Sequence, residues 1–227
     1  MPQVKALLFD FDGVVIDTEV PAFQSWQEIY ERHSQVLSLD AWAACLGTVG
    51  GFDPISHLEG LIGTRIDDRG AVIRRRWARK IELIEKEEFR AGLDGYLSRA
   101  RQLGLNVAIV SSDKDEWITS NLARLRRNEG WDYINCANGD MARAKPLPVL
   151  YEETLAALDI TRDEAVAFED SPNGIAAARA AGIFCVVIPN PVTKSLDLSA
   201  GDLHIDSFED KTLDDVLRAA NARFVHP

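Results

Sequence analysis

Acidic and hydroxyl side chains stand directly after three apolar runs of this 227-residue chain. The runs at 4–9, 105–110 and 165–168 lead into Asp10-Phe11-Asp12-Gly13, Ser111-Ser112-Asp113 and Glu169-Asp170-Ser171. Apolar runs of this length are typical of strands buried on both faces of a parallel sheet. Ligands of such sheets bind outside the carboxyl ends of the strands. We therefore expect one cleft to gather the side chains of Asp10, Asp12, Ser111, Glu169 and Asp170.

Four carboxylates in one cleft repel each other, so either some of them are protonated or a cation lies among them. Oxygen ligands without a nearby histidine or cysteine favour Mg²⁺. Lys145 offers a second positive charge. With both cations present the cleft is close to neutral and can accept a phosphate dianion.

The elements that position these residues follow an α/β pattern. A fourth apolar run lies at 184–188, and amphipathic helices are expected at 92–104, where Gly104 is the stop signal, and at 147–158. Strands and helices therefore alternate. This alternation predicts a doubly wound, Rossmann-like α/β fold with a parallel sheet.

The segment from about 18 to 89 breaks this alternation, because it holds no convincing strand. Its start and stop signals indicate a helix after Pro21, a short helix from Asp40 to Gly47 and a third from Asp53-Pro54 to Gly63. The expected inward positions of these helices and of a longer fourth one are Phe23, Trp26, Ile29, Tyr30, Ile55, Leu58, Leu61, Ile62, Ile73, Trp77, Ile81 and Ile84. An insert of this size is too long for a loop. We expect an α/β core at 1–16 and 90–227 and an α-helical cap at 17–89.

Charge and composition exclude several classes of function. Lys and Arg number 25 against 36 Asp and Glu, and the net charge of −11 argues against nucleic-acid binding. No apolar run approaches the ~20 residues of a membrane span. The first acidic residues come too soon for a signal peptide. Cys45, Cys136 and Cys185 form no CxxC pair for zinc, and free cysteines without an export signal indicate a cytoplasmic protein.

These residues together resemble the haloacid dehalogenase superfamily, in the phosphatase and β-phosphoglucomutase-like branch with a helical cap. The matching motifs, in order along the chain, are the run from Asp10 to Thr18, Ser111 at a strand end, Lys145-Pro146, and Phe168-Glu169-Asp170-Ser171-Pro172-Asn173-Gly174. A single DxD would be weak evidence. The presence of all these motifs in this order, each after the expected strand or helix, is specific evidence for the resemblance.

The resemblance implies a role for each matching residue. Asp10 looks like the nucleophile that forms an aspartyl-phosphate, and Asp12 like the acid and base. Lys145 would balance charge, and phosphoryl oxygens would be held by Ser111 and by neighbouring groups at Gly13, Ser112 and Lys145. Mg²⁺ would be held by Asp10, the Asp12 carbonyl, Glu169 and Asp170. The implied substrate is a small phosphate monoester, with a phosphosugar as one candidate, and the implied state is a monomer or weak homodimer.

Two departures from the mutase pattern favour hydrolysis. The position of the histidine that assists β-phosphoglucomutases falls at Ala22, and the cap loop at 46–52 has no Lys or Arg. A phosphosugar mutase is the enzymatic alternative. A binding module without turnover is the alternative from another class.

The basic run from Arg74 to Lys80 has two possible interpretations. A solvated helix face is the favoured one, and electrostatic steering of an anionic substrate is the other. Trp26 and Trp77 are expected in the core of the cap.

Overall fold

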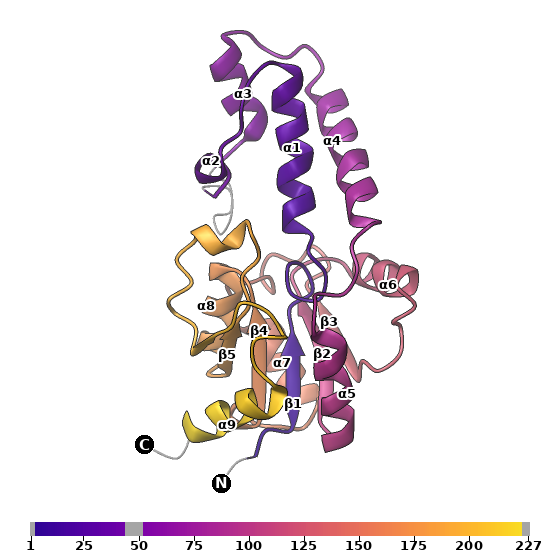
Figure 1. Cartoon of the computed structure of the whole chain (residues 1–227), viewed down its shortest axis with the longest axis vertical. Helices are drawn as coiled ribbons and strands as arrows, with labels where there is room; N and C mark the ends of the chain where they lie inside the picture. The colour runs from indigo at the N-terminus through magenta and orange to yellow at the C-terminus, as the bar shows by residue number, and fades with distance from the viewer. Residues whose placement is uncertain (1–2, 44–51, 224–227) are drawn as a thin grey trace.

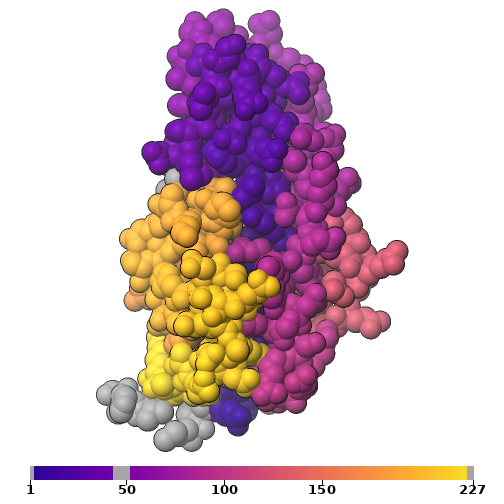
Figure 2. All heavy atoms as spheres, in the orientation of Figure 1, coloured from indigo at the N-terminus to yellow at the C-terminus, as the bar shows by residue number. Residues whose placement is uncertain are grey.

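The computed structural model describes residues 3–43 and 52–223. The molecule is elongated, with four helices at one end and a sheet flanked by helices at the other (Figure 1). The space-filling view gives the same division: atoms of the early part of the chain occupy one end, and the C-terminal segment covers the opposite end (Figure 2). The described residues therefore form the expected two-part arrangement of an α/β unit and a helical unit.

Six parallel strands form the sheet, in the order β3-β2-β1-β4-β5-β6. The strands are β1 Ala6–Phe9, β2 Asn106–Ser111, β3 Tyr133–Cys136, β4 Ala165–Glu169, β5 Phe184–Val187 and β6 Leu203–His204. All four predicted apolar runs form strands. The edge strands β3 and β6 were not predicted, because neither contains a continuous apolar run. The doubly wound parallel fold is thus confirmed.

Helices cover both faces of the sheet. Large side chains of β1, Leu7 and Phe9, share one buried cluster with α5 (Leu93–Leu103), α6 (Asp115–Arg124) and α9 (Leu213–Arg223). Ala6 and Leu8 point to the other face, which packs against α7 (Val149–Ala157) and α8 (Pro172–Ala180). Alanines recur on this second face of β1, β2 and β4, so α7 and α8 can approach the backbone closely.

The helical unit consists of α1 (Glu19–Arg32), α2 (Leu39–Ala43), α3 (Pro54–Ile62) and α4 (Arg69–Ile84). Its own buried cluster includes Trp26, Tyr30 and Leu58. Asp53 caps α3 by accepting from the Ile55 amide at 3.1 Å, with Pro54 in the first turn, as the sequence predicts.

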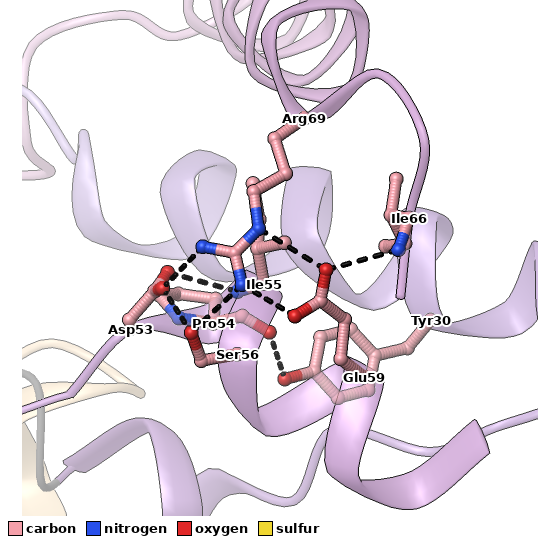
Figure 3. Close-up of polar contacts among 8 residues, drawn as sticks. All are labelled: Tyr30, Asp53, Pro54, Ile55, Ser56, Glu59, Ile66 and Arg69. Carbon is pink, nitrogen blue, oxygen red and sulfur yellow. Dashed lines mark hydrogen bonds and ion pairs between the residues drawn. The ribbon is translucent and has the colours of Figure 1, made fainter. Parts of the chain in front are cut away.

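An arginine clamp joins α3 to α4 (Figure 3). The Arg69 guanidinium, in the first turn of α4, donates to Asp53 at 3.3 Å, to Ser56 Oγ at 3.1 Å and to Glu59. Glu59 also accepts from the Ile66 amide at 2.9 Å, in the connection between the two helices. The clamp thus fixes the turn that brings α4 back toward the sheet.

Several details differ from the sequence-based expectation. Asp40 lies inside α2, which begins at Leu39. The predicted end of this helix at Gly47, and Cys45 and most of the loop at 46–52, fall outside the described residues. Leu61, Ile73 and Trp77 were expected to point inward, but they are 46%, 53% and 51% exposed. Trp77 instead lies toward α6, where its ring is 6.5 Å from that of Trp117.

Both connections between the two units run side by side. Ile16, after the first strand, forms an antiparallel bridge with Phe89, and the Arg90 amide donates to the Val15 carbonyl at 2.9 Å. The Arg90 guanidinium also donates to the carbonyls of Gly13 and Pro189. The chain therefore leaves and re-enters the α/β unit at one point beside the carboxyl end of β1. No helix among the described residues is long and apolar enough to cross a membrane.

Candidate functional site

The predicted site residues meet at the carboxyl ends of the central strands. Asp10 directly follows β1, Ser111 ends β2 and Glu169 ends β4. The strand order reverses direction between β1 and β4, where ligands of doubly wound sheets bind. A cavity of about 400 Å³ opens here, lined by Asp10, Asp12, Thr18, Glu19, Lys80, Ser111, Ser112, Asp113, Lys145, Ser171 and Asn173.

Lys145 is a buried positive charge in this cavity that offsets the charges of two neighbouring carboxylates. Its ammonium lies 2.7 Å from Asp10 Oδ1 and 2.7 Å from Glu169 Oε1. Burial alone would lower the pKa of Lys145, but the two carboxylates raise it above its ordinary value, so that the side chain stays charged. The Lys145 amide also donates to Ser112 Oγ at 3.0 Å, which anchors the lysine to the end of β2.

Three buried carboxylates form a cluster that fits a hard cation. Oxygens of Asp10, Glu169 and Asp170 lie within 4.8 Å of one another. Glu169 Oε1 contacts Lys145 and the Tyr151 hydroxyl, whereas Glu169 Oε2 is buried with no hydrogen-bond partner among the described residues. An oxygen-only donor set with one orphaned carboxylate oxygen suits Mg²⁺.

Asp170 is a buried acid whose pKa is raised. Burial raises its pKa well above the ordinary value, and the nearby charges of Asp10, Glu19 and Glu169 add to the increase. Asn190, in the loop after β5, donates to Asp170 Oδ2 at 2.7 Å and fixes its orientation. The sequence interpretation missed Asn190, although it follows an apolar run as the other site residues do.

Gly13 is required by the close approach of its backbone to Asp170. Its φ is +83°, and a Cβ atom there would lie 2.1 Å from Asp170 Oδ2. Its amide donates to the Ile16 carbonyl at 2.7 Å, so that N–H is already used. Gly13 therefore helps to shape the carboxylate cluster, and its contact with phosphate stays a prediction.

Asp12 lies on the loop after β1 and lines the same cavity as Asp10. Burial raises the pKa of Asp12 to about 7, the charge of Asp10 adds to the increase, and a hydrogen bond from Trp117 opposes it. The Trp117 indole N–H donates to Asp12 Oδ1 at 3.0 Å. A carboxyl group with such a pKa can both donate and accept a proton near neutral pH.

Hydroxyl groups and a helix end complete the base of the cavity. Ser111 is 1% exposed, and its Oγ accepts from the Asp113 amide at 3.0 Å. Ser171 caps α8 by accepting from the Gly174 amide at 3.2 Å. The N-terminus of α8 therefore points its positive end toward the site.

The helical unit supplies further side chains, of which Thr18 ends the first motif and Glu19 and Lys80 lie outside the motifs. Thr18 and Glu19 from the start of α1, and Lys80 from α4, line the same cavity. Burial raises the pKa of Glu19, and the positive charge of Lys80 opposes the increase. Thus the basic run is only partly a solvated face: Arg79 pairs with Glu28 of the neighbouring helix α1, while Lys80 lines the cavity.

Comparisons with known proteins agree with this geometry. A family model described as haloacid dehalogenase-like hydrolase matches residues 4–182. The "Putative phosphatase YhcW" of Bacillus subtilis (strain 168) is 36% identical over 213 residues, which cover 93% of this chain and 95% of that protein.

Solved structures extend the likeness to the fold. The structure of CbbY from Rhodobacter sphaeroides in complex with phosphate is 26% identical, with a TM-score of 0.66, and the match covers 90% of this chain and 95% of that one. A HAD family hydrolase from Deinococcus radiodurans R1 with bound phosphate and sodium has a TM-score of 0.78 at 22% identity, over 97% of this chain and 98% of that one.

Proposed function

The chain belongs to the haloacid dehalogenase-like hydrolases, and on this premise we propose that it is a Mg²⁺-dependent phosphatase of a small phosphate monoester. One observation carries the proposal: Asp10 is paired with Lys145 at 2.7 Å at the base of a cavity that Asp12 also lines. A nucleophile, its counter-charge and a proton donor thus face one space. This is the set of groups that hydrolysis through a covalent intermediate needs.

In the first step a carboxylate oxygen of Asp10 attacks phosphorus, and the bond from phosphorus to the leaving oxygen breaks. Asp12 gives its proton to that leaving oxygen, so that an alcohol departs and an aspartyl-phosphate remains on Asp10. In the second step Asp12 takes a proton from water, the water oxygen attacks phosphorus, and the bond from phosphorus to the Asp10 oxygen breaks, which releases phosphate and restores the Asp10 carboxylate. Lys145 offsets the negative charge near Asp10, and Ser111 and Ser112 offer hydroxyl donors to phosphoryl oxygens.

Mg²⁺ is the proposed cofactor, and the residues that would hold it are Asp10, Asp170, Glu169 and the Asp12 carbonyl. When bound, it supplies positive charge that stabilises the phosphoryl oxygens during transfer. Among the residues of this chain, Asn190 orients Asp170, and Glu169 holds both Lys145 and Tyr151.

We propose further that residues 17–89 act as a cap over a core at 1–16 and 90–227. The paired connections at Ile16 and Phe89 are suited to a hinge, and closure would exclude water from the cavity. The substrate is a small ester, with a phosphosugar as one candidate, since Glu19 and Lys80 of the cap offer polar contacts to its leaving group. We also propose a cytoplasmic location and a monomer or weak homodimer.

The central test replaces Asp10 by Asn, which keeps the shape of the side chain but removes the nucleophile. Asp10→Asn should lose nearly all turnover of 4-nitrophenyl phosphate, and phosphate trapped on the wild-type protein should map to Asp10. Chelation should abolish activity and added Mg²⁺ should restore it. An Asp10→Asn variant with a near-normal rate would show that the proposed mechanism is wrong.

A phosphosugar mutase is the second candidate, because Lys80 brings a cation of the cap to the cavity. Against it, the position of the assisting histidine is occupied by Ala22, which is 4% exposed. We expect release of inorganic phosphate from hexose or smaller phosphates. Formation of glucose 6-phosphate from β-glucose 1-phosphate faster than phosphate release would favour the mutase. A protein with no turnover on a broad set of phosphate esters would favour the binding module.

A further inference from the structure

Trp117 contacts the Asp12 side chain from outside the sequence motifs. It lies on α6, and its indole N–H donates to Asp12 Oδ1 at 3.0 Å. Among the described residues, Trp117 is the side chain that donates a hydrogen bond to the carboxyl group of Asp12. Oδ2 is left to exchange the proton that the proposed mechanism moves. A carboxyl group held at one oxygen has lost rotation about its terminal bond, which keeps the other oxygen in one direction.

Side chains of the cap contact the same tryptophan. The ring of Trp77, on α4, is 6.5 Å from the Trp117 ring at an interplanar angle of 46°. The Lys80 ammonium lies 5.4 Å from the centre of the Trp77 ring and 5.7 Å from that of Trp117. Cation–π contacts of this kind are favourable within about 6 Å. Trp117 therefore contacts Asp12 as well as two side chains of the cap, and Lys80 also lines the cavity that Asp12 lines.

This contact also explains why Trp77 is not in the core of the cap. Its side chain is 51% exposed and lies on the helix face toward α6. A large aromatic residue that leaves its own apolar cluster loses burial, and here it gains a contact with the core instead. The pair of tryptophans joins α4 to the loop that carries Asp12.

We propose that Trp117 is a positioning residue for Asp12, and that Trp77 and Lys80 make this positioning depend on the place of the cap. The inference rests on the proposed phosphatase function, because it assigns Asp12 the proton transfer. With the cap in this position, the contacts with Trp77 and Lys80 keep Trp117 hydrogen-bonded to Asp12, and Oδ2 of Asp12 is directed to the leaving oxygen. With the cap displaced, Trp117 loses its contacts with Trp77 and Lys80, and its side chain restrains the Asp12 carboxyl group less.

The test uses Trp117→Phe, which keeps an aromatic ring on α6 but removes the N–H donor. General acids matter most for poor leaving groups and are worth about 10²–10⁴ in rate. We expect kcat on phenyl phosphate to fall on the order of tenfold more than kcat on 4-nitrophenyl phosphate, with little change in KM. The Mg²⁺ concentration for half-maximal activity should stay the same, because Trp117 hydrogen-bonds the side chain of Asp12, whereas the proposed metal contact of Asp12 is its backbone carbonyl.

Trp131→Phe is the matched control. The Trp131 indole also donates a hydrogen bond, to the Arg127 carbonyl at 3.0 Å, but neither Trp131 nor Arg127 lines the cavity, and the Trp131 ring packs against Phe9 and Phe89. Its kcat ratio between the two esters should equal that of the wild type. The coupling to the cap is tested by Trp77→Ala, which should change the ratio in the same direction and add little to Trp117→Phe, since residues in one contact network are not additive.

A second measurement needs no turnover. In ¹⁵N-labelled protein, the Trp117 indole resonance is assigned by its absence in Trp117→Phe, and Asp12→Asn should shift it while leaving that of Trp131 in place. An equal loss on both esters, or an unshifted resonance, would overturn the positioning role. If the wild type hydrolyses both esters and Asp10→Asn does not, such a result contradicts this inference alone. If the wild type hydrolyses neither, the proposed function and the inference that rests on it are both overturned.

Discussion

The amide of Asn190 holds the carboxylate of Asp170 at 2.7 Å, and both side chains are buried, at 2% exposure each. Asn190 is itself fixed, because its Oδ1 accepts from the amides of Val192 and Thr193 at 2.9 Å. Oδ2 of Asp170 is thus oriented by a loop that belongs to a different strand, β5. This relationship ties the geometry of the carboxylate cluster to the β5 loop.

Asn190→Ala should weaken the site for Mg²⁺ without removing any carboxylate. Groups that orient metal ligands typically change affinity 10–100-fold, so we expect the Mg²⁺ concentration for half-maximal activity to rise by about tenfold or more. Activity at saturating Mg²⁺ should recover most of its wild-type value. Asn221→Ala is the control, since Asn221 bonds only the distant Val4 amide among the described residues. An unchanged Mg²⁺ requirement in Asn190→Ala would remove Asn190 from the site.

Mg²⁺ affinity should increase as pH rises. The pKa of Asp170 in the folded, metal-free protein lies well above its unfolded value, chiefly because of burial. The protonated form is therefore stable at low pH and is lost as pH rises through the folded pKa. Since a metal needs the carboxylate, protons compete with it, and affinity should fall by up to about tenfold per pH unit below that pKa. Calorimetric titration in buffers of different ionisation enthalpy measures the protons released. Binding without proton release would contradict this assignment.

Residues that follow a recognisable apolar run were predictable from the sequence. The strands leading to Asp10, Ser111 and Glu169 are buried on both faces, so their composition alone identifies them. The edge strand β3 was missed because its run, Tyr133–Cys136, includes the polar Asn135. Asn135 is nevertheless buried, since its amide donates to the Leu150 carbonyl at 2.9 Å. Edge strands need less apolar sequence than central ones.

Side chains that reach the site from elsewhere were not predictable by this reasoning. Trp117 and Asp12 are brought together by the packing of α6 beside β1, and nothing local in either segment indicates the contact. Helical periodicity also misplaced Trp77, because it identifies an apolar stripe but not which neighbour the stripe meets. The sequence left two interpretations of the basic run that contains Lys80. Tertiary packing separates its residues, because Lys80 lines the cavity whereas Arg79 pairs with Glu28.

Removing the charge of Lys145 should destabilise the fold in the absence of Mg²⁺. Lys145→Met leaves Asp10 and Glu169 without their buried counter-charge, and breaking such a pair costs about 3–5 kcal/mol. Loss of the cation raises the pKa of Glu169 further, so the penalty should be largest at alkaline pH and shrink as the carboxyl groups protonate on acidification. Urea unfolding at several pH values, with chelator present, measures it.

Lys194→Met provides the matched control for that experiment. Lys194 is an exposed lysine whose ion pair with Asp206 spans 3.7 Å. Such pairs contribute little to stability. If both lysine variants lost the same free energy of unfolding, the buried arrangement around Lys145 would have no special role in stability.

Gly13→Ala should damage both stability and metal binding, and a second glycine separates the two effects. Gly13 and Gly104 both have left-handed backbone, with φ of +83° and +68°. Left-handed conformation costs an alanine roughly 1–2 kcal/mol. A Cβ at Gly104 would meet nothing within 4 Å, whereas at Gly13 it would lie 2.1 Å from Asp170 Oδ2.

We therefore expect Gly104→Ala to lower the free energy of unfolding by about that backbone cost and to leave the Mg²⁺ requirement unchanged. Gly13→Ala should lose more stability and also raise the Mg²⁺ requirement, because Asp170 must move away from its position beside Asn190. Thermal unfolding and Mg²⁺ titration of activity on the two variants measure these effects, and equal results for both would show that the close approach of Gly13 to Asp170 is not what requires a glycine there.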